Sequence, residues 1–117
     1  NVILGGYREQ ALDYLDVMAC FDIVSLLKPG TDGTARAIRE AFAMGIPCVV
    51  SDYGMLPEVV EDGRTGRVVP CDPEALAQAW LELLRDPQRR KAMGARARAV
   101  AEQRFDLGRM VDELEAL

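Results

Sequence analysis

Short apolar runs alternate with stretches of helical periodicity, and this alternation constrains the fold more than any other feature of the 117-residue sequence. The runs at residues 21–27 and 48–51 predict strands covered on both faces, as parallel sheets require. Shorter runs at residues 2–4 and 67–70 predict two more strands, the latter towards a sheet edge because Pro70 lacks a backbone donor. Strands that alternate with helices pair in parallel through right-handed crossovers. We therefore predict an α/β fold: a Rossmann-like parallel sheet with helices on both faces.

The remaining stretches carry helix signals. Apolar spacing and capping residues predict helices over residues 9–20, 34–45, 57–61, 72–85, 86–103 and 106–115. Asp72-Pro73 and Asp86-Pro87 each combine an N-cap residue with a first-turn proline. In open α/β sheets ligands bind beyond the carboxyl ends of the strands, which is where the polar loop at residues 28–33 is expected.

Composition excludes several functions. The sequence contains no histidine, so the most usual general base and the commonest metal ligand are absent from it. Three cysteines without paired spacing indicate reduced thiols and a cytoplasmic setting, and we predict no metal and no cofactor. A formal net charge of -5 argues against general nucleic-acid binding.

Charge is nevertheless uneven, with eight basic and three acidic residues between Arg85 and Arg109. A basic helix of this kind can lie on an anionic membrane surface. Its apolar positions, however, form an ordinary core-facing stripe: Met93, Ala97, Val100 and Ala101. A solvated helix face is therefore the favoured interpretation, and a peripheral position at the inner membrane face is the alternative.

The segment from Asp32 to Ala41 carries the chemistry. Asp32 stands at a predicted helix start, and Glu40 follows eight residues later, about 80° further around the helix axis. Gly33 lets the backbone approach a ligand, and the free N–H groups at Gly33, Thr34 and Ala35 suit a diphosphate or sugar hydroxyl. Carboxylates accept hydrogen bonds from vicinal hydroxyls. The segment therefore resembles a cradle for a polyol diphosphate.

Taken with the segments that follow it, this sequence resembles the C-terminal domain of the retaining GT-B glycosyltransferases (glycosyl transferases group 1). The matching segments are residues 32–51, Leu56-Pro57-Glu58-Val59-Val60, residues 62–69, the two Asp-Pro helices and Arg104-Phe105-Asp106. The resemblance implies that Glu40 binds the nucleotide ribose and that Asp32, with Gly33, Thr34 and Ala35, binds the donor sugar.

Three positions depart from the family pattern. Asp32 replaces the usual glutamate and reaches about 1.3 Å less far. Lys28 stands in the loop after a strand, where it is either an extra cation for the nucleotide diphosphate or an exposed loop residue. Tyr53-Gly54-Met55 replaces a Gly-Gly pair.

Glu58 is expected to be structural, as a first-turn acid, or to support the site.

The resemblance implies metal-independent transfer of a hexosyl group (EC 2.4 class), with retention of configuration, from a UDP-, GDP- or ADP-linked sugar to an unknown acceptor. Residues 1–117 are expected to be a partial C-terminal nucleotide-sugar-binding domain, without the N-terminal acceptor domain and the first strands. The isolated chain is then expected to be inactive and to self-associate through an exposed strand edge.

Other classes stay open on the sequence. Asp32 could be a simple N-cap and Glu40 a surface partner of Arg36, in which case the chain is a non-catalytic Rossmann-like module used for protein contacts. A GT-B epimerase or phosphorylase shares the sheet but predicts the segment between the two carboxylates less well.

Overall fold

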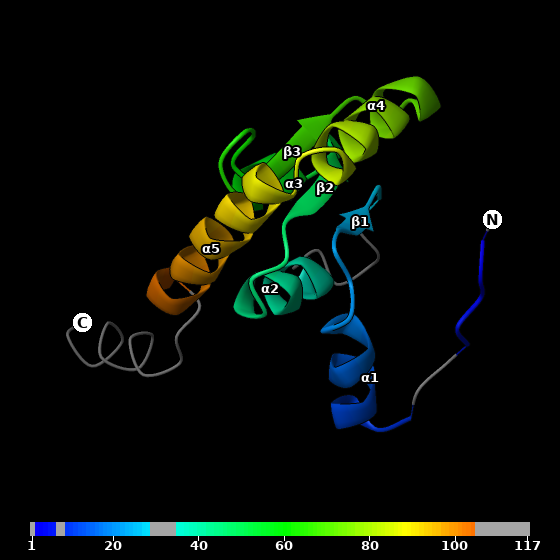
Figure 1. The fold of residues 1–117 in the computed structure, drawn as a ribbon, viewed down its shortest axis with the longest axis vertical. Coiled ribbons are helices and arrows are strands. Elements are labelled where there is room, and N and C mark those ends of the chain that lie inside the picture. Colours follow the sequence, from blue (N-terminus) through cyan, green and yellow to red (C-terminus); the bar gives the residue numbers. More distant parts are fainter. Residues whose placement is uncertain (1, 7–8, 29–34, 105–117) are drawn as a thin grey trace.

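The computed structural model describes residues 2–6, 9–28 and 35–104, which form a parallel sheet with helices on both faces (Figure 1). The strands are β1 (Val24–Leu26), β2 (Cys48–Ser51) and β3 (Gly66–Val69), in the order β1-β2-β3. The helices are α1 (Ala11–Met18), α2 (Arg36–Ala43), α3 (Leu56–Val59), α4 (Pro73–Leu84) and α5 (Pro87–Arg104). The predicted fold class is confirmed.

Register fixes the sheet. Val24 of β1 pairs with Cys48 of β2, and Cys48 pairs with Gly66 of β3, all in parallel. An added Cβ on Gly66 would lie 2.1 Å from the Cys48 carbonyl oxygen, so only glycine fits this pairing. Every residue of β2 is buried, as expected for a central strand covered on both faces.

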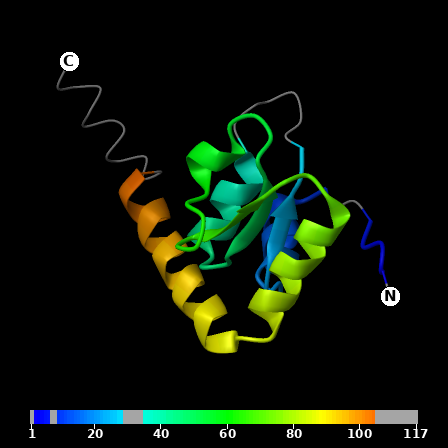
Figure 2. The ribbon, with the colours of Figure 1, turned by 90° about the horizontal axis from the view of Figure 1, so that it is seen from above.

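Side chains from the two faces of β2 enter two separate clusters. Cys48 and Val50 pack in a cluster with α2, α3 and the second half of α5. Val49 packs on the other face with Ala79 and Leu83 of α4 and Met93 of α5. Figure 2 shows α4 and α5 joined by a short turn and diverging, with the sheet between them.

Capping behaves as predicted at the two Asp-Pro sequences. The Asp72 carboxylate accepts a hydrogen bond from the Ala75 N–H at 3.1 Å, and the Asp86 carboxylate accepts one from the Arg89 N–H at 3.1 Å. Gly45 has a φ of 74° and ends the turn after α2.

Two strand predictions need correction. Residues 2–4 are not a strand; Val2, Ile3 and Leu4 are 87–92% exposed, and within the described part of the chain no strand pairs with them. The run at residues 21–27 forms only a three-residue strand, and Phe21 is 47% exposed. Among the described residues β1 lies at the edge of the sheet, so the apolar residues next to it in the sequence, such as Phe21, are left partly exposed to solvent. The predicted helix at residues 106–115 lies outside the described residues.

Candidate functional site at the carboxyl edge of the sheet

The carboxyl edge of the sheet is where an open α/β fold binds ligands, and here the strand ends are hydrogen-bonded to one another. Ser51, fully buried at the end of β2, donates its hydroxyl to the Leu27 carbonyl, one residue beyond β1. The Ser51 hydroxyl oxygen also accepts a hydrogen bond from the Tyr53 N–H at 3.3 Å. The Asp52 N–H donates to the Val69 carbonyl at 3.0 Å, which brings in β3. The first residues after β1 and β2 are therefore held in place.

Lys28 lies at this edge. Its ammonium nitrogen is 5.4 Å from the centroid of the Tyr53 ring, within cation–π range. Both side chains are exposed. The structure thus places Lys28 directly beyond β1, the position expected from the sequence, and adds an aromatic partner that the sequence did not indicate.

Ala35 is the N-cap residue directly before α2. It has φ 50° and ψ 46°, the left-handed region that residues with a Cβ rarely adopt, and its side chain is buried. Its carbonyl accepts hydrogen bonds from the N–H groups of Ile38 and Arg39. Strained backbone of this kind persists where surrounding structure holds it, often at functional sites. Asp32, Gly33 and Thr34, predicted to bind the donor sugar, lie outside the described residues.

Glu40 lies on α2 with its side chain 26% exposed, and its carboxylate is 3.3 Å from the Arg36 guanidinium. This is the i,i+4 pair that the alternative interpretation required. Arg36 is 81% exposed, so the pair is weak and solvent-screened, and it leaves the carboxylate open to other partners.

Glu58 is an exposed residue in the first turn of α3. It lines a hollow of about 240 Å³ together with Glu61, Thr65 and Arg104. A wider hollow of about 910 Å³, lined by Phe21, Trp80 and neighbours, lies beside β1. Neither hollow is lined by Lys28 or Glu40. The candidate site is therefore defined by the carboxyl ends of the strands and not by either hollow.

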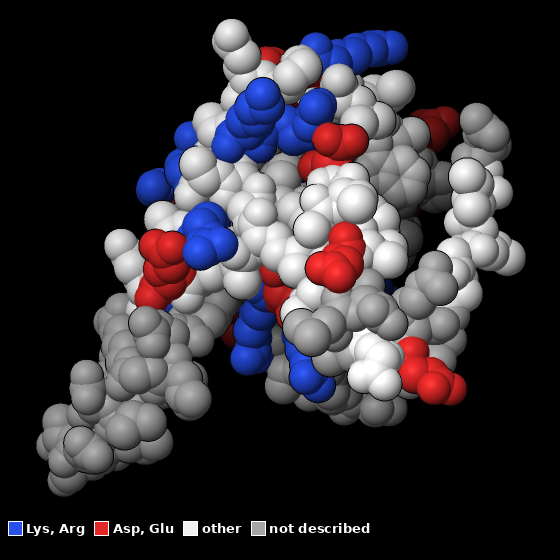
Figure 3. Space-filling view, turned by 60° about the horizontal axis from the view of Figure 1, so that its bottom comes forward, with Lys and Arg blue, Asp and Glu red and all other residues white. Residues whose placement is uncertain are grey.

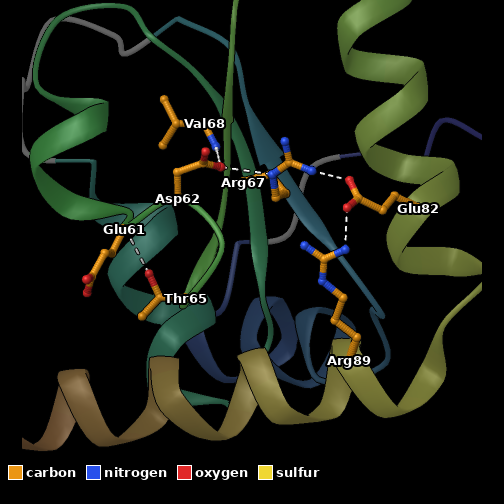
Figure 4. A network of polar contacts seen from close by, with 7 residues as sticks. All are labelled: Glu61, Asp62, Thr65, Arg67, Val68, Glu82 and Arg89. Carbon is orange, nitrogen blue, oxygen red and sulfur yellow. Dashed lines mark hydrogen bonds and ion pairs between the residues drawn. The ribbon is translucent and has the colours of Figure 1, made fainter.

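A polar network that the sequence did not indicate binds β3 to the helices beside it (Figure 4). The Arg67 guanidinium contacts the Asp62 carboxylate at 2.8 Å and also the Glu82 carboxylate of α4, which in turn contacts Arg89 of α5. The Asp62 carboxylate also accepts the Val68 N–H at 2.9 Å. Burial raises the pKa of Asp62, but the hydrogen bonds from Val68 and Arg67 outweigh it, so that pKa lies below its usual value. This network is structural.

Several basic side chains of α5 bind backbone carbonyl groups elsewhere in the domain. Arg90 donates to the Leu83 carbonyl at 3.0 Å, Arg96 to the Arg64 carbonyl at 2.8 Å, and Arg98 to the Ala43 carbonyl at the end of α2. The predicted core-facing stripe is confirmed, with Met93, Ala97 and Ala101 buried and Val100 partly buried against the core. Basic and acidic side chains are interspersed on the face in Figure 3.

Two further observations concern metals and membranes. Among residues 2–6, 9–28 and 35–104, no cluster of three potential ligand side chains is placed to hold a metal ion. In the same ranges, no helix has both the length and the apolar character needed to cross a bilayer. The three cysteines are free, and burial raises the pKa of the Cys48 thiol.

The fold and this edge define a Rossmann-like parallel α/β domain, and comparison with known proteins gives its family. The family model "Glycosyl transferases group 1" matches residues 1–86. The chain belongs to this family.

Curated relatives include N-acetyl-alpha-D-glucosaminyl L-malate synthase of Bacillus anthracis, 29% identical over 103 residues, which are 87% of this chain and 27% of that protein. A GDP-mannose-dependent alpha-(1-6)-phosphatidylinositol monomannoside mannosyltransferase of Mycolicibacterium smegmatis is 43% identical over 68 residues, 57% of this chain and 18% of that protein. The chain therefore spans about a quarter, or less, of the length of these relatives.

Solved structures agree. The crystal structure of Anabaena HepE with UDP-glucose has a TM-score of 0.73 and 29% identity, covering 86% of this chain and 29% of that one. Sucrose-phosphate synthase from Thermosynechococcus elongatus has a TM-score of 0.70 and 25% identity, covering 89% of this chain and 28% of that one.

Proposed function

We propose that this chain is the nucleotide-sugar-binding part of a glycosyltransferase, which transfers a hexosyl group from a nucleotide sugar to an acceptor bound elsewhere in the protein. The observation that carries the proposal is its likeness to HepE in complex with UDP-glucose over 86% of the chain, within a shared family. The carboxyl-edge arrangement of Lys28, Ala35 and Tyr53 supports it, because such edges bind nucleotides in this class of sheet.

Glu40 is proposed to bind the nucleotide ribose through its carboxylate. Its partial burial and its weak, solvent-screened pairing with Arg36 leave acceptor capacity for hydroxyl groups. Asp32, Gly33, Thr34 and Ala35 are proposed to hold the sugar and phosphates. Glu58 is proposed to be structural.

Leaving-group stabilisation is proposed to need no metal. A diphosphate can be neutralised by backbone N–H groups and cations held in fixed positions. Lys28 is one such cation. Further cations are proposed to come from an earlier strand and loop of the same domain, and the acceptor site from an N-terminal domain. We propose further that configuration is retained, that the nucleotide is UDP, GDP or ADP, and that the protein works in the cytoplasm.

The test is a donor-turnover assay on the complete protein with UDP-, GDP- and ADP-linked hexoses, followed by NMR of the product's anomeric proton. Turnover with retention, undiminished by a chelator, is expected. A protein that binds no nucleoside diphosphate and turns over no donor would instead be a non-catalytic module, and inversion would contradict the proposed stereochemistry alone.

Residues 1–117 alone are proposed to be inactive and to self-associate. The outer edge of β1 is unpaired among the described residues, and the exposed apolar side chains of Phe21, Trp80 and Leu84 lie beside it. Light scattering on this chain should show oligomers, and Phe21→Lys should reduce them. A monomer at high concentration, or authentic transfer by the isolated chain, would contradict this proposal.

A further inference from the structure

The ends of β1 and β2 are joined by one buried hydroxyl. Ser51 donates to the Leu27 carbonyl and accepts from the Tyr53 N–H at 3.3 Å. Lys28 directly follows Leu27, so the backbones that carry Lys28 and Tyr53 are both fixed by this hydroxyl. Their side chains meet at the carboxyl edge without either being buried.

Among the described residues, the Lys28 ammonium lies against the Tyr53 ring and pairs with no carboxylate. It lies 5.4 Å from the ring centroid, and within the described part of the chain no ion pair neutralises it. A carboxylate partner would cancel the charge, whereas an aromatic face restrains the ammonium and leaves its full charge for an anion. Tyr53 is 49% exposed and Lys28 is exposed as well, so the cation remains accessible from solvent.

We propose that Tyr53 is a positioning residue that holds the Lys28 ammonium at the carboxyl edge, where it binds the diphosphate of the nucleotide-sugar donor. This inference rests on the proposed function, because it assigns a group at the same site. A free lysine side chain is flexible and loses much rotamer freedom when it binds. The ring reduces that loss in advance, so the cation binds a diphosphate more tightly than an unrestrained lysine would.

The contact between Lys28 and Tyr53 could also serve only to cover the Tyr53 ring, and that alternative predicts a different result. If the lysine stem only shields the ring from water, loss of the ring changes stability and leaves ligand selectivity unchanged. If the ring positions the charge, its loss weakens diphosphates most, since they carry the most negative charge.

The experiment measures binding by calorimetry to the complete protein, with UDP, GDP and ADP and their monophosphates as probes. The variants are Tyr53→Leu, Tyr53→Phe, Lys28→Met and the double variant Lys28→Met/Tyr53→Leu. Circular dichroism checks each fold, and Tyr53→Phe is the matched control because it keeps the ring and removes only the hydroxyl.

For the nucleoside diphosphate that the wild type binds best, Tyr53→Leu and Lys28→Met should each weaken affinity about three- to tenfold. The monophosphate should be affected less, and Tyr53→Phe should stay within about twofold of wild type. The double variant should be no weaker than Lys28→Met, because the ring acts only through the ammonium.

Three results would overturn the inference while leaving the proposed function intact. They are an equal loss of affinity in Tyr53→Leu and Tyr53→Phe, an equal loss for diphosphates and monophosphates, and additive losses in the double variant. A wild-type protein that binds none of these nucleotides would overturn the proposed function and the inference with it.

Discussion

Replacing Gly94 with alanine tests how closely α5 approaches the end of α2. A Cβ at this position would lie 2.1 Å from the Gly45 carbonyl oxygen and 3.0 Å from its carbonyl carbon. Ordinary contact needs more than 3 Å, so α5 or the Gly45 turn must move by about 1 Å. Overpacking of this kind costs about 1–3 kcal/mol, against a gain of about 1 kcal/mol from the better helix propensity of alanine.

The Gly94→Ala variant should therefore lose about 0–2 kcal/mol of the free energy of unfolding, or more if the backbone cannot move. Urea unfolding followed by circular dichroism measures the change. Ala95→Gly, at an exposed position of the same helix, reports propensity alone and should cost about 1 kcal/mol. A Gly94→Ala variant more stable than wild type would show that the two backbones do not approach this closely.

Three further predictions concern the start of α2, the network beside β3 and the predicted sugar-binding carboxylate. Ala35→Gly should stay within about 1 kcal/mol of the wild-type stability, because relief of the left-handed strain offsets the lost methyl group. Ala35→Val should cost about 2–3 kcal/mol, because a β-branched side chain fits the left-handed region poorly. Equal stability of the two variants in thermal unfolding would contradict the observed φ. Asp62→Ala should destabilise by about 1 kcal/mol at neutral pH, because the Val68 N–H loses its acceptor and Arg67 a partner. The folded pKa of Asp62 lies below 3.8, so the carboxylate stabilises the fold above that pH, and this contribution is lost as the pH falls through the folded pKa. The difference in unfolding free energy between Asp62→Ala and wild type should therefore shrink in acid. A constant difference from pH 6 to 3 would refute this. Asp32→Glu should preserve or raise donor turnover if Asp32 is a short version of the family's glutamate, and a loss greater than that of Asp32→Ala would show that the loop requires the shorter side chain.

Local signals predicted most of the fold. The caps at Asp72 and Asp86, the glycine after α2 and the buried strand β2 all depend on residues close in sequence, and all were confirmed. The strand predictions for residues 2–4 and 21–27 were wrong in part, because an apolar run does not indicate whether another strand lies beside it.

The candidate site depended on tertiary contacts to a greater degree. Lys28 could be proposed from its loop, but its partner Tyr53 is 25 positions away and meets it only because β1 and β2 are neighbours. Ser51, the one hydroxyl in a buried apolar strand, was a signal that could have been followed. The network around Arg67 spans residues on β3, α4 and α5, and no spacing in the sequence predicts it.

Calorimetric titration of the complete protein and its Glu40→Ala variant with nucleoside diphosphates and nucleotide sugars tests the central claim most directly. Glu40→Ala should weaken binding by about 2 kcal/mol, roughly thirtyfold, through loss of charge-assisted hydrogen bonds to the ribose, with the fold unchanged. Arg36→Ala, which removes the surface partner of Glu40 and leaves its carboxylate in place, is the matched control and should bind within about twofold of wild type. Unchanged affinity in Glu40→Ala would remove this residue from the donor site and contradict the proposed role of the chain.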